Sequence, residues 1–328
     1  MSVKNDKKFE EQIKASKIKI SNIGAYEKFI KAIKPEKEYE DFLRNKRVVI
    51  VGPSKYILDP ELTEHGKLID AYDVVARIKC LNLLPFDKNI GPKTKFIGKR
   101  VDVIYHWKKI QRNSLYEQEL CQHNVQHLRI PNSVNFKADK LPGGKTNYFY
   151  LKNNTSVCDE NWSCRHVSFP CADYTAYCES LEPKPDGPST RALQTGTAGI
   201  MELITSDCKE LYITGLTFYH GGDNMFQKKV SDHAHPVAGK HNGAVEMRLF
   251  IDALLYEIKT RGSLNRIKID KVLKYVVLKY IELYQQTEKW KWYRAKTAGS
   301  IKELVERQFG LSSSSVPYQA AAHLRDSS

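Results

Sequence analysis

Short apolar runs alternate with longer helical patterns along the chain between residues 48 and 216. Runs of this kind, rich in β-branched residues and bounded by turn residues, are typical of buried strands. Their alternation with helices predicts an α/β fold with a Rossmann-like, doubly wound, mostly parallel sheet flanked by helices. The expected strands are Val48–Val51, Tyr72–Ile78, Val101–Trp107, His127–Pro131 and Glu210–Gly215.

The pattern changes on both sides of this alternating region. Residues 1–46 are charged and helical in pattern, which predicts an N-terminal arm, and the main domain is expected over 47–262. Beyond it, apolar residues at helical spacing predict basic amphipathic helices over 263–310, followed by a disordered tail over 311–328. The interval 131–188 is irregular in pattern, and a loop of that length in a compact domain predicts a functional segment.

Composition and charge narrow the class of protein. The chain has 328 residues, 41% of them hydrophobic, and no apolar run near the ~20 residues that cross a bilayer. The charged start lacks the apolar core of a signal peptide, so a soluble, cytoplasmic protein without an anchor is expected. The net charge of +14 predicts attraction to nucleic acid, anionic lipid or a negatively charged sugar nucleotide.

Motifs and local composition choose among these anionic partners. The chain has no helix-turn-helix, zinc-finger or RNA-binding signature, so no nucleic acid is expected. The segment 268–296 is basic and rich in aromatic residues, which fits a helix packed on the sheet or a peripheral contact with an anionic membrane.

The cysteines do not indicate a metal site. The seven cysteines are an odd number in a chain with no secretion signal, which predicts reduced thiols. Cys158, Cys164, Cys171 and Cys178 cluster around His166, but their spacing lacks the CxxC pairs typical of zinc. No metal and no cofactor are therefore expected.

A tight turn follows the first expected strand, with Gly52, Pro53 and Ser54 directly after Val51. In open α/β sheets, ligands bind beyond the carboxyl ends of the strands, and glycine there lets the backbone approach a phosphate or sugar. The stretch has neither GxGxxG nor GxxxxGK[ST], which disfavours a dinucleotide-binding enzyme or a P-loop NTPase. The turn is thus a candidate nucleotide contact, with a purely structural turn as the alternative.

Three later segments carry further candidate chemistry. Thr195 and Gly196 stand where a helix is expected to begin, and amides there favour an anion, although an ordinary helix cap has the same pattern. His220 comes just past the expected strand Glu210–Gly215. His241 and Glu246 lie at the start of another helix, and histidine can accept a proton near neutral pH.

The order and spacing of these segments resemble the sialyltransferases of glycosyltransferase family 29 over about residues 48–255. The long motif of that family is matched by Gly52, Ser54, Gly66, Ile69, Asp70, Asp73, Val75 and Arg77, with Ile90–Thr94 following. The short motif is matched by Thr195, Gly196, Cys208 and Gly215. The third motif corresponds to Tyr219 and His220, and the very short motif to His241 and Glu246.

This resemblance implies the sialyltransferase variant of a GT-A-like fold and a specific reaction. Such enzymes transfer sialic acid from CMP-sialic acid to a glycan hydroxyl with inversion and without a metal, so the CMP-sugar is a co-substrate. By resemblance His241 is the base, His220 donates to the leaving phosphate, and Glu246 organises the site. The residues implied to bind the nucleotide of the sugar donor are Gly52, Pro53, Ser54, Arg77, Lys79, Thr195, Gly196, Thr197, Gly215 and Tyr219. His233 and His235 are alternatives to His220, because the spacing between the last two motifs is loose.

The chain also departs from the pattern of the family. The family usually has Cys at the position of Val48, paired with the equivalent of Cys208, and the loss of that bridge fits a cytosolic protein. Pro53 and Lys79 replace asparagines that contact the nucleotide, and Gln194 replaces a serine. Different nucleotide contacts are therefore expected.

Three alternatives stay open beside a sialyltransferase. The first is the same fold acting on another CMP-activated acid sugar such as CMP-Kdo. The second is an inactive relative that binds CMP or an anionic glycan. The third is a basic nucleic-acid-binding protein whose motifs match by chance.

Overall fold

The strands of the protein form one extended sheet. The computed structural model describes residues 3–59, 66–78, 98–105, 125–129, 146–151, 162–167, 170–181, 193–221, 242–286 and 295–311. Within these residues the sheet has eight strands in the order β6-β5-β4-β3-β2-β1-β7-β8. The strands are β1 (Arg47–Val51), β2 (Val74–Ile78), β3 (Val103–Tyr105), β4 (His127–Arg129), β5 (Thr146–Leu151), β6 (Trp162–Val167), β7 (Glu210–Thr214) and β8 (Ile267–Ile269).

Most of this sheet is parallel, which confirms the predicted Rossmann-like α/β class. All pairings from β4 through β3, β2, β1 and β7 to β8 are parallel, whereas β4 with β5 and β5 with β6 pair in antiparallel fashion at one end. Val48 in β1 aligns with Val74 in β2 and with Leu211 in β7. The expected strands at 48–51, 72–78, 101–107, 127–131 and 210–215 are all confirmed, with shorter bounds for several of them.

The strand order creates a topological switch point between β1 and β7. From β1 the chain passes to β2, β3 and β4 on one side, and it later returns to β7 and β8 on the other side of β1. In open α/β sheets the loops at such a point diverge and leave room for a ligand at the carboxyl ends of the strands. The loops after β1 and β7 are therefore where a site is expected.

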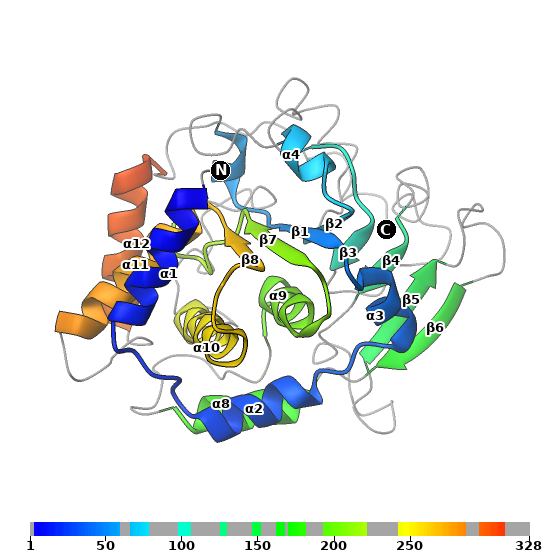
Figure 1. Cartoon of the computed structure of the whole chain (residues 1–328), viewed down its shortest axis with the longest axis horizontal. Helices are drawn as coiled ribbons and strands as arrows, with labels where there is room; N and C mark the ends of the chain where they lie inside the picture. The colour runs from blue at the N-terminus through cyan, green and yellow to red at the C-terminus, as the bar shows by residue number, and fades with distance from the viewer. Residues whose placement is uncertain are drawn as a thin grey trace, which may run out of the picture.

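Helices cover both faces of the sheet, which explains why the parallel strands are continuously apolar. Successive side chains of a strand point to opposite faces. Val48 and Ile50 pack in the large core beneath the sheet, where α9 (Thr195–Thr205) and α10 (Gly243–Arg261) lie in Figure 1. Val49 and Val51 pack on the other face with residues of the 3₁₀ helix η1 (Lys55–Leu58) and of α4 (Gly66–Asp70).

The helices at both ends of the chain contribute to the same core. The N-terminal helices α1 (Val3–Ala15), α2 (Ile23–Ala32) and α3 (Lys37–Leu43) bury Phe9, Phe29 and Leu43 there. The C-terminal helices α11 (Lys271–Gln286) and α12 (Ala295–Phe309) bury Val276 and Val305. The expected boundary after residue 262 falls between α10 and β8, and β8 pairs with β7. Among the helices described, none combines the length and the apolar character needed to span a bilayer.

The interval 131–188 differs from the expectation of an irregular loop. It contains β5, β6 and the helix α8 (Cys171–Glu179), which packs against α2 (Figure 1). Tyr148 to Leu151 are consecutive apolar or aromatic residues, so β5 shows none of the polar alternation by which a strand with one solvated face is recognised.

Candidate functional site

The loops after β1 and β7 contact each other through their backbones at the switch point. The Gly52 N–H donates to the Thr214 carbonyl at 2.8 Å, and the Ser54 N–H donates to the Gly215 carbonyl at 3.0 Å. A Cβ atom on Gly52 would lie only 2.2 Å from the Gly215 carbonyl oxygen, and Gly215 itself has a φ of +75°. The contact between the two loops therefore requires glycine at both positions, whether or not a ligand is bound.

A hollow opens beside this contact, at the carboxyl ends of the strands. Its walls come from the β1 loop, the end of β2, the start of α9 and the β7 loop, and its volume is about 50 Å³. A space of this size admits a few water molecules or one compact polar group, and thus one part of a sugar nucleotide. The lining residues are Pro53, Ser54, Ile78, Gln194, Thr195, Gly196, Leu216, Thr217, Phe218 and Tyr219.

The start of α9 forms one wall of the hollow and could attract an anion. Thr195 and Gly196 begin the helix and are buried, and amides at a helix N-terminus carry partial positive charge. A Cβ on Gly196 would lie 3.1 Å from methyl carbons of Ile78 and Leu216, so a larger residue would crowd the hollow. Thr195 and Gly196 of the short motif thus form one wall of the hollow, and the backbone amides at the start of α9 are its hydrogen-bond donors.

Glu246, in the first turn of α10, holds the start of α9 through hydrogen bonds. Its carboxylate is 1% exposed, accepts the Gln194 N–H at 3.0 Å, and also accepts a hydrogen bond from the Thr197 hydroxyl. Asn242 caps the same helix by accepting the Val245 N–H at 3.1 Å. Glu246 therefore links the first turn of α10 to the start of α9.

The β7 loop presents two aromatic residues in a strained backbone. Phe218 and Tyr219 have φ values of 50° and 65°, in the left-handed region that side chains other than glycine rarely adopt. Burial, together with the charge of Glu246, raises the pKa of Tyr219 to about 12. The Tyr219 hydroxyl therefore stays protonated at neutral pH and can donate a hydrogen bond.

His220 follows Tyr219 but packs against α11. Its ring is fully buried, with Nδ1 3.1 Å from the Thr217 carbonyl and Nε2 2.5 Å from the Tyr280 hydroxyl. A carbonyl can only accept, so Nδ1 carries a proton, and burial keeps the pKa of Tyr280 well above its usual value. In the neutral imidazole Nε2 then has no proton, so the Tyr280 hydroxyl donates to it. His220 is absent from the lining of the hollow as the described residues define it.

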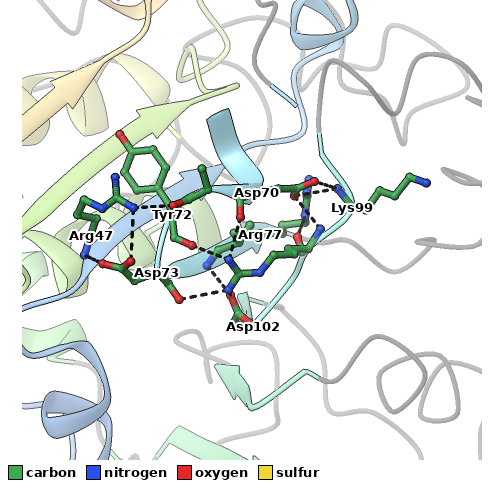
Figure 2. A network of polar contacts seen from close by, with 10 residues as sticks. Arg47, Asp70, Tyr72, Asp73, Arg77, Lys99 and Asp102 are labelled. Atoms are coloured by element: carbon green, nitrogen blue, oxygen red, sulfur yellow. Dashed lines mark hydrogen bonds and ion pairs between the residues drawn. The ribbon is translucent and has the colours of Figure 1, made fainter. Parts of the chain in front are cut away.

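Arg77 and the paired acids of the long motif bind neighbouring backbone groups. The buried Arg77 side chain donates from Nε to the Arg100 carbonyl at 2.8 Å (Figure 2). Asp70 accepts the N–H groups of Lys99 and Arg100, each at 2.9 Å, and Asp73 accepts the Arg47 N–H at 2.8 Å. These motif residues join β2 to the adjoining turns, and none of them lines the hollow among the residues described.

Several predicted residues lie outside the described part of the chain: Lys79, His233, His235 and His241. Cys208 is described, and it is a free, buried thiol with its Sγ 3.3 Å from an Arg266 nitrogen. Within the described ranges, no three His, Cys, Asp or Glu side chains gather in a group that could hold a metal ion.

The structure also brings residues to the hollow that were not among the predicted site residues. Leu216, Thr217 and Phe218 line it because they continue directly from the end of β7. The available signal was positional, since ligands of open α/β sheets bind beyond the carboxyl ends of the strands at the switch point.

Comparisons with known proteins add a structural likeness. No family model matches the sequence, and no curated protein matches it. Among solved structures the chain is similar to a crystal structure of a mammalian sialyltransferase in complex with Gal-beta-1-3GalNAc-ortho-nitrophenol. The alignment covers 83% of this chain and 87% of that chain, with 13% sequence identity and a TM-score of 0.38. A superposition this loose assigns neither a fold nor an activity. The fold is therefore established by the strand order, and the site is defined by the geometry of the loops.

Proposed function

We propose that the chain is a glycosyltransferase of sialyltransferase type, which transfers sialic acid from CMP-sialic acid to a glycan hydroxyl. One observation carries this proposal: residues of the long, short and third motifs, far apart in sequence, line a single hollow at the switch point. Ser54, Gly196 and Tyr219 represent these three motifs. A chance match of motifs would not require their residues to meet where an α/β sheet binds ligands.

The proposed reaction inverts the anomeric carbon and uses no metal. The attacking hydroxyl must lose a proton, and the leaving CMP phosphate must be stabilised as its charge develops. His241, directly before the cap residue Asn242, is the proposed base. The amides at the start of α9 and the Tyr219 hydroxyl are suitable donors for the phosphate.

His220 would join the phosphate contacts only after a change of partner. Its Nε2 accepts from Tyr280 in this structure. Donation from Nε2 to a leaving phosphate therefore requires a proton on that nitrogen and the release of the Tyr280 hydroxyl. The proposed role of His220 thus includes a local rearrangement of the β7 loop.

The test is release of CMP from CMP-sialic acid and from CMP-Kdo, with and without a lactose-type acceptor. Wild type should release CMP, and His241→Ala should lower turnover by about 10²- to 10⁴-fold while leaving binding of the sugar donor largely intact. His127→Asn serves as a control, because His127 is buried against α3, away from the hollow.

Each outcome of this experiment distinguishes one functional hypothesis from the others. Release from CMP-Kdo alone would change the proposed sugar, and unchanged turnover in His241→Ala would remove His241 from the mechanism. CMP binding by calorimetry without any release would indicate an inactive binder of CMP or an anionic glycan. Salt-dependent DNA binding without CMP binding would overturn the proposal.

The proposed setting is the cytoplasm, with a peripheral contact to an anionic membrane. The basic, aromatic-rich segment 268–296 supports this contact by composition. Sedimentation with vesicles that contain anionic lipid, against vesicles of neutral lipid, tests it directly.

A further inference from the structure

Asp270 is a buried carboxylate outside every motif of the sequence, and it contacts both loops of the switch point. It follows β8 and precedes α11, and it is 1% exposed. One carboxylate oxygen, Oδ2, accepts the Tyr56 hydroxyl at 2.6 Å and the Gly215 N–H at 2.9 Å. The other oxygen, Oδ1, accepts the Leu273 N–H at 2.8 Å at the start of α11.

These contacts close a ring of hydrogen bonds around the base of the two loops. Asp270 binds the N–H of Gly215, and the carbonyl of Gly215 accepts the Ser54 N–H at 3.0 Å. Ser54 lies two residues before Tyr56, whose hydroxyl returns to Asp270. The ring therefore links the loop after β1 to the loop after β7 directly beside the hollow.

Asp270 is itself held in place on both sides. Its N–H donates to the Ile213 carbonyl at 3.1 Å, and its carbonyl accepts the Lys274 N–H at 3.0 Å. Burial raises the pKa of its carboxyl group, and the hydrogen bonds from Leu273, Tyr56 and Gly215 partly offset this effect. Burying a carboxylate is unfavourable unless donors surround it, so the Tyr56 hydroxyl and the two amides must stay close to it.

We propose that Asp270 is a positioning residue, which holds the loops after β1 and β7 in one arrangement before the sugar donor binds. The proposal builds on the function inferred above, since it concerns the same hollow. Ser54 and the residues after Gly215 both line that hollow. A ligand that contacts both loops binds more tightly and reacts faster when their separation is already correct.

The competing explanation is that Asp270 only caps α11 and stabilises the fold. A matched control separates the two, because the chain contains a second buried pair of the same chemistry. The Tyr177 hydroxyl donates to Asp252 Oδ2 at 2.8 Å between α8 and α10, and both residues are buried. Tyr56→Phe and Tyr177→Phe therefore each remove one buried hydroxyl from a carboxylate, but only the former touches the ring.

The first measurement is amide hydrogen exchange in peptides that span 52–56 and 212–216. Tyr56→Phe should speed exchange in both peptides by about tenfold relative to wild type, whereas Tyr177→Phe should leave them unchanged. This readout needs no ligand and no activity. Equal protection of these amides in wild type and Tyr56→Phe would overturn the proposal. This outcome is independent of whether the protein is a transferase.

The second measurement is the kinetics of CMP release from CMP-sialic acid. Tyr56→Phe should lower kcat/KM by about tenfold, mostly through a higher KM for the sugar donor, and Asp270→Asn by up to about a hundredfold. The double variant should lose less than the product of the two single losses, because both changes break the same ring. An active wild type with equal kcat/KM in Tyr56→Phe and Tyr177→Phe would reject the positioning role. A wild type that releases no CMP would instead reject the proposed function.

Discussion

In two regions of the molecule a carboxylate accepts backbone amides at a glycine turn, and the two regions differ in whether they adjoin the hollow. In the β2 clamp, formed by Arg47, residues 70–73 and residues 98–102, Asp70 gathers the amides that follow Gly98 (Figure 2). At the switch point, Asp270 gathers the amide of Gly215 in the same way. Both glycines have positive φ, +71° at Gly98 and +75° at Gly215.

The surroundings separate the two regions. The β2 clamp lies largely at the surface, where the Asp73 side chain is 43% exposed, whereas Asp270 is 1% exposed. The switch point also adjoins the hollow, with walls from four segments. A carboxylate that binds the amides of a glycine turn thus stabilises turns in different parts of the fold. Such a contact is relevant to a site only where the turn lies at the switch point. The β2 clamp matches the long motif without lining the hollow, while Asp270 lies outside every motif and supports it.

The largest expected effect comes from adding a methyl group at each region. Gly52→Ala places a Cβ 2.2 Å from the Gly215 carbonyl oxygen, so we expect a loss of about 3 kcal/mol in the free energy of unfolding. CMP binding should be lost with it. Gly98→Ala places a Cβ 2.4 Å from an Asp70 carboxylate oxygen and 2.9 Å from the Gly66 carbonyl oxygen at a positive φ, and it should cost about 2 kcal/mol with CMP binding retained. Urea unfolding and calorimetry measure both quantities, and loss of CMP binding in both variants would erase the distinction between the regions.

The next effect compares two carboxylates at constant shape. In Glu246→Gln the amide oxygen can still accept the Gln194 N–H, but the NH₂ group must face the Thr197 hydroxyl, which loses its hydrogen bond to a charged acceptor. We expect kcat/KM for CMP release to fall about a hundredfold and the free energy of unfolding to fall by about 2 kcal/mol. Asp70→Asn should cost about 1 kcal/mol of stability and change kcat/KM by less than about twofold. Comparable kinetic losses in the two variants would place the β2 clamp in the site.

A smaller effect tests the support of the β7 loop by α11. Tyr280→Phe removes the hydroxyl that donates to His220, while two preceding residues of that loop keep their strained φ values. We expect about a fivefold loss of turnover and about 1 kcal/mol of stability, because the support that Tyr280 gives to the loop outweighs the easier release of Nε2. Steady-state CMP release and thermal unfolding provide the measurement. Faster turnover would mean instead that release of the Tyr280 hydroxyl limits donation from His220 to the leaving phosphate.

The smallest effect on activity is expected at His127, which belongs to neither region and whose titration must be known before pH profiles of the hollow are interpreted. Burial, with the nearby charges of Arg129 and Lys46, lowers the pKa of His127 from 6.5 to about 3. Between these values the unfolded chain binds a proton that the folded chain does not, so stability falls as the pH drops below about 6.5. The slope of the free energy of unfolding against pH should approach about 1.4 kcal/mol per pH unit, which is the limit for one titrating group. His127→Asn should remove this contribution in urea unfolding at neutral pH and at about pH 5, and an unchanged pH dependence would contradict it.

Sequence reasoning identified the parts of this protein that depend on local pattern. The parallel strands β1, β2, β3, β4 and β7 follow from short apolar runs, and the alternation with helices is sufficient for the fold class. The positions of Ser54, Thr195 and Tyr219 at the ends of elements also follow, because the carboxyl ends of parallel strands and the helices packed on them converge. β5, β6 and β8 were not predicted, because β5 and β6 lie in an interval without a regular pattern, and β8 is a three-residue strand at the end of the sheet that is specified mainly by its neighbour.

The tertiary structure alone decided which of these residues meet and why. Gly52 is required by the backbone of Gly215, which is distant in the sequence, and no local pattern reports such a contact. Asp270 acquires its role through hydrogen bonds to two loops that come together only when β1, β7 and β8 pair. The sequence by itself therefore determined the elements and the candidate ends of strands, because burial has a local period. The geometry of the hollow was left to the folded chain, because close approach and buried hydrogen bonds depend on partners that the sequence keeps apart.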